Sequence, residues 1–213
     1  MHERYLQRFL VACLSVAASL GPSLSTADEA ALAEQLRGGG YHLFLPHAAA
    51  EQTYPTDYRD PPECAPRTWL TPTGWGTAKA VGVGLLKRGV LVEVVHASPV
   101  CAARHTAYLV IGADRVRIDP QLAIDCGNRD AATKSAAELR ALLRAPLPYS
   151  DVNVAVVAHP CSLAAIADPQ WPACARQPEP GSVVVLSTAG AAIRWVGCLS
   201  ATTLTAWSRE REF

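Results

Sequence analysis

The sequence predicts an α/β fold in which the main strands run parallel and the chain ends in an antiparallel hairpin. Three short apolar runs, at residues 41–45, 90–95 and 152–158, have the length and composition of strands and alternate with helix-like segments. The first of them shows no polar alternation, as expected for a parallel strand covered on both faces. Half of the 213 residues are apolar, which is enough for one substantial core.

The first residues have the features of a secretory signal. Arg4 and Arg8 precede an apolar run at 9–20, and small residues at 25–27 fit a cleavage site near Ala27. The apolar run is shorter than the roughly 20 residues that a membrane-spanning helix requires. We therefore predict a signal peptide at residues 1–27, one folded domain at residues 28–213, and an exported soluble protein that is periplasmic or secreted.

Cysteine usage agrees with export, because six cysteines remain after cleavage in a compartment that permits disulfides. They are Cys64, Cys101, Cys126, Cys161, Cys174 and Cys198. Six cysteines allow fifteen pairings, and sequence does not choose among them. Cys161 and Cys174 are the closest pair and would staple the segment after His159, whereas buried free thiols are the alternative. No CxxC or CxxH spacing is present, so we expect no structural zinc site.

The first half of the mature chain alternates helices and strands. An amphipathic helix is expected at 28–37, stopped by three glycines, and the strand at 41–45 follows. Residues 51–67 are rich in proline and lack periodicity, which indicates a long surface loop. The segment Thr71-Pro72-Thr73-Gly74 has capping chemistry and opens a helix that ends at Gly89.

The second half continues this alternation. Ser98-Pro99 is a good helix start, which would place Arg104 about two turns into that helix. A strand at 114–118, a helix at 131–144, the strongly β-branched strand at 152–158 and a brief helix at 162–167 follow. The last elements are a hairpin formed by 182–186 and 192–199, a packed Trp207, and a charged tail at 209–213 that frays.

Reactive side chains come directly after the ends of the predicted strands. His47 follows the first strand, Ser98 and Arg104 follow the second, and His159 follows the strand at 152–158. If the three strands are adjacent and parallel, these residues converge on one crevice, where open α/β sheets place their chemistry.

The order and context of these residues resemble the histidine phosphatase superfamily, the phosphoglycerate mutase-like and acid phosphatase-like group. The resemblance covers most of the mature chain, from Leu36 to Trp207. It implies a three-layer α/β/α sandwich with a mostly parallel central sheet. It also implies catalytic roles for His47 as the nucleophile that attacks phosphorus, and for Arg104 and His159 as donors to the transferring phosphoryl group.

The chemistry of such a site requires a neutral imidazole whose second nitrogen is held by a hydrogen bond, so that the correct tautomer faces phosphorus. Donors aimed at the phosphoryl oxygens then stabilise the transition state. We expect Arg67, His96 and Ser98 to contact the substrate, and no metal or cofactor to take part. The resemblance also implies a small phosphorylated molecule as the partner. Lys plus Arg equals Asp plus Glu, at 19 each, so no basic surplus attracts nucleic acid, and we expect no membrane contact after signal cleavage.

Two departures from the family pattern leave the function open. Pro46 stands where an arginine should precede the nucleophile, so it supplies neither charge nor a backbone donor. The proton donor to the leaving group has three candidates: Asp119, Asp125 and Glu179.

We therefore keep two functions. One is an exported phosphomonoesterase that forms a phosphohistidine, and the other is an impaired pseudophosphatase that binds a phosphorylated or anionic ligand. A remote third interpretation is a metal site built from His47, His96 and His159.

Overall fold

The protein folds around a six-stranded sheet flanked by helices. A computed structural model describes residues 25–51, 69–123, 126, 129–188 and 192–211. The sheet order is β5-β4-β6-β1-β7-β8. Strands β5, β4, β6 and β1 are mutually parallel, and β7 runs antiparallel to both of its neighbours, β1 and β8. The strands are β1 (His42–Pro46), β4 (Val92–Ala97), β5 (Val116–Ile118), β6 (Asn153–Ala158), β7 (Val183–Ser187) and β8 (Arg194–Leu199). The predicted mostly parallel sheet with a C-terminal antiparallel hairpin is confirmed.

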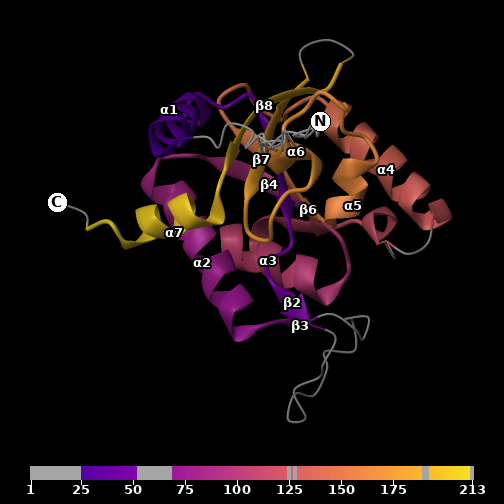
Figure 1. The fold of residues 1–213 in the computed structure, drawn as a ribbon, viewed down its shortest axis with the longest axis horizontal. Coiled ribbons are helices and arrows are strands. Elements are labelled where there is room, and N and C mark those ends of the chain that lie inside the picture. Colours follow the sequence, from indigo (N-terminus) through magenta and orange to yellow (C-terminus); the bar gives the residue numbers. More distant parts are fainter. Residues whose placement is uncertain (1–24, 52–68, 124–125, 127–128, 189–191, 212–213) are drawn as a thin grey trace, which may run out of the picture.

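Helices cover both faces of the sheet, which gives three layers (Figure 1). One face carries α1 (Thr26–Leu36), α2 (Pro72–Lys87), α3 (Cys101–Ile111) and α7 (Ala201–Arg209), and the other carries α4 (Arg129–Arg144), α5 (Pro160–Ala164) and α6 (Ala173–Arg176). Two short 3-10 helices, η1 (Ala113–Arg115) and η2 (Pro120–Leu122), flank β5. A separate two-stranded ribbon pairs β2 (Ala50–Glu51) with β3 (Trp69–Leu70).

Strand β1 shows why its sequence is continuously apolar. Leu43 and Leu45 are buried in the core under the first group of helices, while Phe44 is buried in the core under α4 and α5. Successive side chains of a strand point to opposite faces, so a strand between two helical layers needs apolar residues at every position. The continuous apolar run thus positions β1 in the centre of the sheet.

One buried polar residue ties three segments together at the start of β6. Asn153 is fully buried, and its side-chain nitrogen donates to the carbonyls of Leu36 and Leu91, both at 2.9 Å. Its oxygen accepts from the backbone of Tyr41 at 3.2 Å. Because its amide is satisfied by backbone groups on three sides, Asn153 fixes the ends of α1, β1 and β4 relative to β6.

The helix predicted to be capped by Ser98 begins two residues later than expected. Val100 is the residue that precedes the first turn of α3, and no side chain caps this helix. Ser98 instead accepts from the Val100 amide at 3.3 Å and bonds a histidine across the sheet, so its oxygen serves the site rather than the helix. Arg104 is consequently the fourth residue of α3, one turn into the helix and not two.

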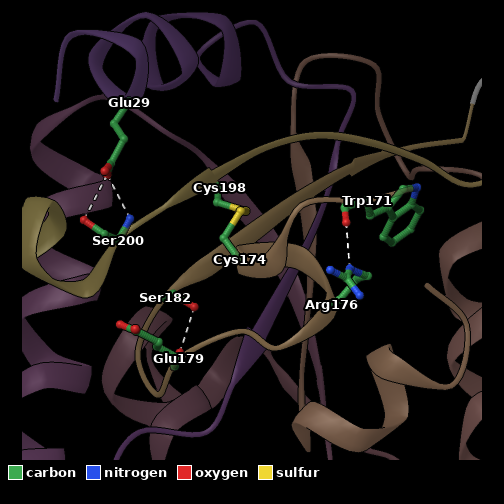
Figure 2. The surroundings of a disulfide bond; sticks show 8 residues. All are labelled: Glu29, Trp171, Cys174, Arg176, Glu179, Ser182, Cys198 and Ser200. Atoms are coloured by element: carbon green, nitrogen blue, oxygen red, sulfur yellow. Dashed lines mark hydrogen bonds between the residues drawn. A yellow bond between two sulfur atoms is a disulfide. The ribbon is translucent and has the colours of Figure 1, made fainter. Parts of the chain in front are cut away.

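The C-terminal helix α7 was not expected from the sequence, although the predicted packing of Trp207 is confirmed by its 5% exposure. The helix starts at Ser200, whose hydroxyl accepts from the Thr203 amide. Figure 2 shows Glu29 of α1 reaching the same residue, and its carboxylate accepts from the Ser200 amide at 2.8 Å and from its hydroxyl at 3.2 Å. This buried carboxylate joins the first and last helices.

Two disulfides link the segments around α5 and α6. Cys126 is bonded to Cys161, and Cys174 is bonded to Cys198 of β8 (Figure 2). Cys101 is also disulfide-bonded, and Cys64 lies outside the described residues. The suggested Cys161–Cys174 pair is wrong, because α6 packs on β8 and presents Cys174 to Cys198 instead. Sequence proximity failed here because the packing of helices and loops on the sheet, not chain distance, decides which cysteines meet.

Among the described residues, no helix combines the length and the apolar character needed to span a bilayer. The predicted signal peptide lies almost entirely outside these residues. Its expected cleavage point near Ala27 falls in the first turn of α1, whose capping residue is Ser25.

Candidate functional site

Four polar residues lie in a row, each directly after the end of one of the four parallel strands. His47 follows β1, His159 follows β6, Ser98 follows β4, and Asp119 follows β5. Backbone bonds continue the sheet by one residue at these ends, from His47 to Ala158 at 3.1 Å, from Ser98 to Val157 at 3.0 Å, and from Asp119 to Ala97 at 2.8 Å. Because β6 lies between β1 and β4, the strand order brings both histidines and the serine to one edge of the sheet.

The two imidazoles face each other. The ring centroids of His47 and His159 lie 5.3 Å apart, with an angle of 72° between their planes. Ser98 Oγ lies 3.1 Å from His159 Nε2, and this contact is buried. The structure therefore brings together three of the residues to which the sequence analysis gave site roles: His47, His159 and Ser98.

A backbone carbonyl sets the tautomer of His47. Its Nδ1 lies 3.0 Å from the carbonyl oxygen of Ala48, and a carbonyl can only accept. The neutral ring must then carry its proton on Nδ1, which leaves a lone pair on Nε2. The Ala48 amide is itself held, because it donates to Thr106 Oγ1 of α3 at 3.0 Å. The segment that orients the His47 ring is thus fixed to α3.

Burial keeps both histidines neutral near pH 7. It lowers the pKa of His47, partly offset by the Ala48 carbonyl, and it lowers the pKa of His159 to about 4, with the neighbouring His47 as the second cause. An uncharged pair suits a nucleophile. An anion bound beside His159 would raise its pKa and favour the imidazolium form.

The buried His159 should make stability depend on pH. An unfolded histidine has a pKa of about 6.5, so between about pH 6.5 and pH 4 the unfolded chain binds more protons than the folded one. Stability therefore rises with pH across this window, by on the order of 3 kcal/mol from this residue, and is fully present above it. Urea unfolding of the wild type and of His159→Asn at pH 7 and at pH 4.5 should show a smaller pH effect in the variant. An equal effect in both proteins would contradict this role.

The face of α3 that meets the His47 loop does not include Arg104. Residues four apart share a helix face, and here Thr106 donates to the Ala102 carbonyl while Ala102 packs against Ala48. Arg104 lies between them in sequence and therefore on a different face. Its Nε donates to the hydroxyl of Tyr108 at 2.8 Å, and its guanidinium lies 5.5 Å from the centre of that ring. The helix thus presents Ala102 and Thr106, not a guanidinium, to the segment that holds His47.

The other predicted site residues lie in several places. His96 is half-buried on the face of the sheet under α4, where it lines a cavity with His42. Asp119 stands in the row of strand ends and accepts from the Gln121 amide, while Glu179 lies in the loop between α6 and β7. Arg67 and Asp125 are outside the described residues. Within the described chain, no group of three or more His, Cys, Asp or Glu side chains could hold a metal ion.

The sequence did not reveal two features of the site, a backbone carbonyl and a disulfide. The Ala48 carbonyl orients His47, and a carbonyl has no sequence signature. The disulfide between Cys126 and Cys161 ties the segment before α4 to α5, two residues beyond His159. A paired cysteine so close to a candidate catalytic histidine was a visible signal, but its partner could not be chosen from the sequence.

Gly74 allows α2 to dock on the His47 loop. The Ala49 carbonyl accepts from the Thr71 amide at 3.0 Å, and a Cβ atom added at Gly74 would lie 2.0 Å from that carbonyl oxygen. Gly74→Ala should therefore displace the loop and destabilise the protein by about 1–3 kcal/mol in urea unfolding. Gly76 is the matched control, because nothing lies within 4 Å of its added Cβ. Gly76→Ala should be neutral or stabilise by up to about 1 kcal/mol, and equal losses in both variants would refute the close contact.

Comparison with solved structures finds a similar fold in several phosphatases. The protein histidine phosphatase SixA complexed with tungstate is 19% identical, with a TM-score of 0.53 over 77% of this chain and 99% of that one. A chain described as the phosphohistidine phosphatase SixA of Nakamurella multipartitia is 26% identical, with a TM-score of 0.51 over 75% and 95%. The phosphoserine phosphatase of Entamoeba histolytica in complex with 3-phosphoglyceric acid is 13% identical, with a TM-score of 0.53 over 77% and 98%.

Neither a protein-family model nor a curated protein matches the sequence itself. The structural likeness nevertheless extends over nearly the whole length of these phosphatases, and it agrees with the strand order described above. The chain therefore has the fold of the histidine phosphatase superfamily, the phosphoglycerate mutase-like group.

Proposed function

We propose that the protein is an exported phosphomonoesterase that acts through a phosphohistidine at His47. The observation that carries this proposal is the tautomer of His47, because the Ala48 carbonyl occupies Nδ1 and leaves Nε2 as a nucleophile beside His159. Nε2 would form a bond to phosphorus while the ester oxygen leaves with the bonding pair and takes up a proton. Water would then hydrolyse the phosphohistidine and regenerate the imidazole.

His159 and Ser98 would bind the transferring group. An anion beside His159 favours its protonated form, so substrate binding would itself create a cation in the site. Among the three candidates, Asp119 is the best placed to be the proton donor. It directly follows β5, which is the neighbour of the strand that Ser98 follows. For Arg104 the predicted role requires the guanidinium to leave Tyr108 when substrate binds.

A second candidate function is the binding of a phosphorylated or anionic ligand without turnover. Two observations favour it: Pro46 lies buried in β1 directly before His47, and Ala102 occupies the α3 position that packs on the adjacent Ala48. Neither residue supplies a donor to a phosphoryl oxygen.

Export is supported by the disulfides, which persist in oxidising compartments, and by the signal-like first residues. The expected partner is a small phosphorylated molecule.

One pair of measurements tests both functions on the mature chain. Release of p-nitrophenol from p-nitrophenyl phosphate, with acid-labile phosphate on the protein in rapid quench, would support the phosphatase. Thermal stabilisation by tungstate without hydrolysis would favour the ligand-binding candidate, since saturation at a hundred times Kd adds about 2.7 kcal/mol. Absence of both hydrolysis and stabilisation would overturn the two proposals together.

A further inference from the structure

A cavity of about 570 Å³ lies on the face of the sheet covered by α4, near the end of that helix. Its floor includes His42 and Val154 of the central strands, and its walls include Leu142 of α4 and Tyr149. Volumes of this size are typical of small-molecule sites. All of its lining residues belong to the described chain, and only His96 among them was expected from the sequence to contact the phosphatase substrate.

The cavity is separate from the facing imidazoles. His42 begins β1 and His47 follows its end, so the two residues are about 16 Å apart along the strand. His96 also lies on the cavity face, beside Arg117 in the register of β4 with β5. A ligand in this cavity would therefore occupy a site different from that of the transferring phosphoryl group.

A buried acceptor at one end of the cavity indicates a ligand. His42 is only 2% exposed, and its Nδ1 has no hydrogen-bond partner among the described residues. A buried polar atom without a partner costs about 1–3 kcal/mol, so native structures rarely keep one. Burial lowers the pKa of His42, partly offset by a hydrogen bond to the backbone of Ala145, so the ring is neutral. A carbonyl takes the ring N–H, which leaves the other nitrogen to accept from a hydroxyl or amine of a bound molecule.

Guanidinium groups line the other end of the cavity. Arg115 and Arg117 come from the edge of the sheet at β5, three strands away from β1, which corresponds to about 14 Å between the backbones. Glu93 and Asp114 also line the cavity, so the arginines are not a general excess of positive charge. These carboxylates disfavour a dianion such as phosphate but leave room for a single carboxylate paired with a guanidinium.

Apart from His96, the walls between these ends are apolar. Val94, Val154 and Leu142 lie between the histidine and the arginines, and the exposed ring of Tyr149 lies at the same cavity. We propose that this cavity binds an elongated small carboxylate whose acid group pairs with Arg117 and whose opposite end donates a hydrogen bond to His42. This site does not depend on the proposed phosphatase activity.

Three matched probes test the assignment by ligand-observed NMR titration of the mature chain. The first, 4-hydroxyphenylacetate, has both end groups and should bind saturably at millimolar concentration. Phenylacetate lacks the hydroxyl donor and tyramine lacks the carboxylate, so both should bind at least about tenfold more weakly. Saturating tungstate should leave the affinity for 4-hydroxyphenylacetate unchanged, because tungstate is expected at His47.

Variants locate the site. Arg117→Gln should weaken 4-hydroxyphenylacetate binding by at least about tenfold. Arg140→Gln is the charge-matched control, since Arg140 is an exposed residue of α4 that does not line the cavity and should bind as the wild type does. Leu142→Trp should fill the cavity and abolish binding with little change in thermal stability, because Leu142 is only partly buried. No saturable binding, equal binding of tyramine, or unchanged binding by Arg117→Gln would each overturn the proposal.

Discussion

Replacing His47 with alanine is expected to remove phosphatase activity, by at least about a thousandfold in kcat/KM. The reason is that no other described side chain combines a fixed tautomer with a position at the end of β1. His159 has its Nε2 in a hydrogen bond with Ser98 and cannot simply replace it. The measurement is p-nitrophenyl phosphate hydrolysis with parallel quantification of acid-labile protein phosphate.

His105→Ala is the matched control for this experiment. Its imidazole lies 5.3 Å from the ring centres of Trp69 and Trp75 and makes no contact with His47. The control should keep wild-type activity and lose none of the acid-labile label. If His47→Ala and the wild type hydrolyse the substrate equally, the phosphohistidine mechanism is refuted even though the fold remains.

Introducing guanidinium groups beside His47 is expected to increase turnover by about 10²–10³. The two positions are Pro46, which precedes the nucleophile, and Ala102, on the face of α3 that packs on Ala48. A guanidinium donates in parallel to two oxygens of a phosphoryl group, and its contribution is largest where water is excluded. Pro46→Arg, Ala102→Arg and the double variant should be compared by kcat/KM.

A neutral variant distinguishes the effect of the added charge on turnover from the effect of replacing the proline backbone. Pro46→Gln restores the backbone amide and a long polar side chain but adds no charge, so it should give little of the gain. Both positions are buried, and thermal unfolding must show that each variant is folded. Folded variants that bind tungstate more tightly and still do not turn over would favour the ligand-binding function over the phosphatase.

The central fold was predictable because its signals are local. Phe44 lies in a run that is apolar on both faces, and Gly38 to Gly40 end the preceding helix, so β1 was placed to within one residue. The helix α7 was missed because it is short and its buried face consists of Thr203, Leu204 and Trp207, which is a weak helical period. Its formation depends on packing against α2 and on Glu29 at its first turn.

The site was predictable in part for a different reason. His47 and His159 could be paired because each follows a strand, and parallel strand ends lie at one edge. The direction of Arg104 could not be inferred in the same way. It depends on the first residue of α3, and a two-residue difference in that start changes the direction of every later side chain by about 200°.

Helix α2 contacts three neighbours through backbone rather than through side chains. Besides Gly74 against Ala49, a Cβ at Gly82 would lie 2.3 Å from the Val110 carbonyl oxygen, and one at Gly84 would lie 2.3 Å from that of Leu204. Helix α2 is therefore in close backbone contact with the carboxyl-terminal helix α7 at one end and with the turn after His47 at the other. A truncation before Leu204 would remove the contact at one end of α2. It would therefore weaken the positioning of His47, although the deleted residues lie far from that edge of the sheet.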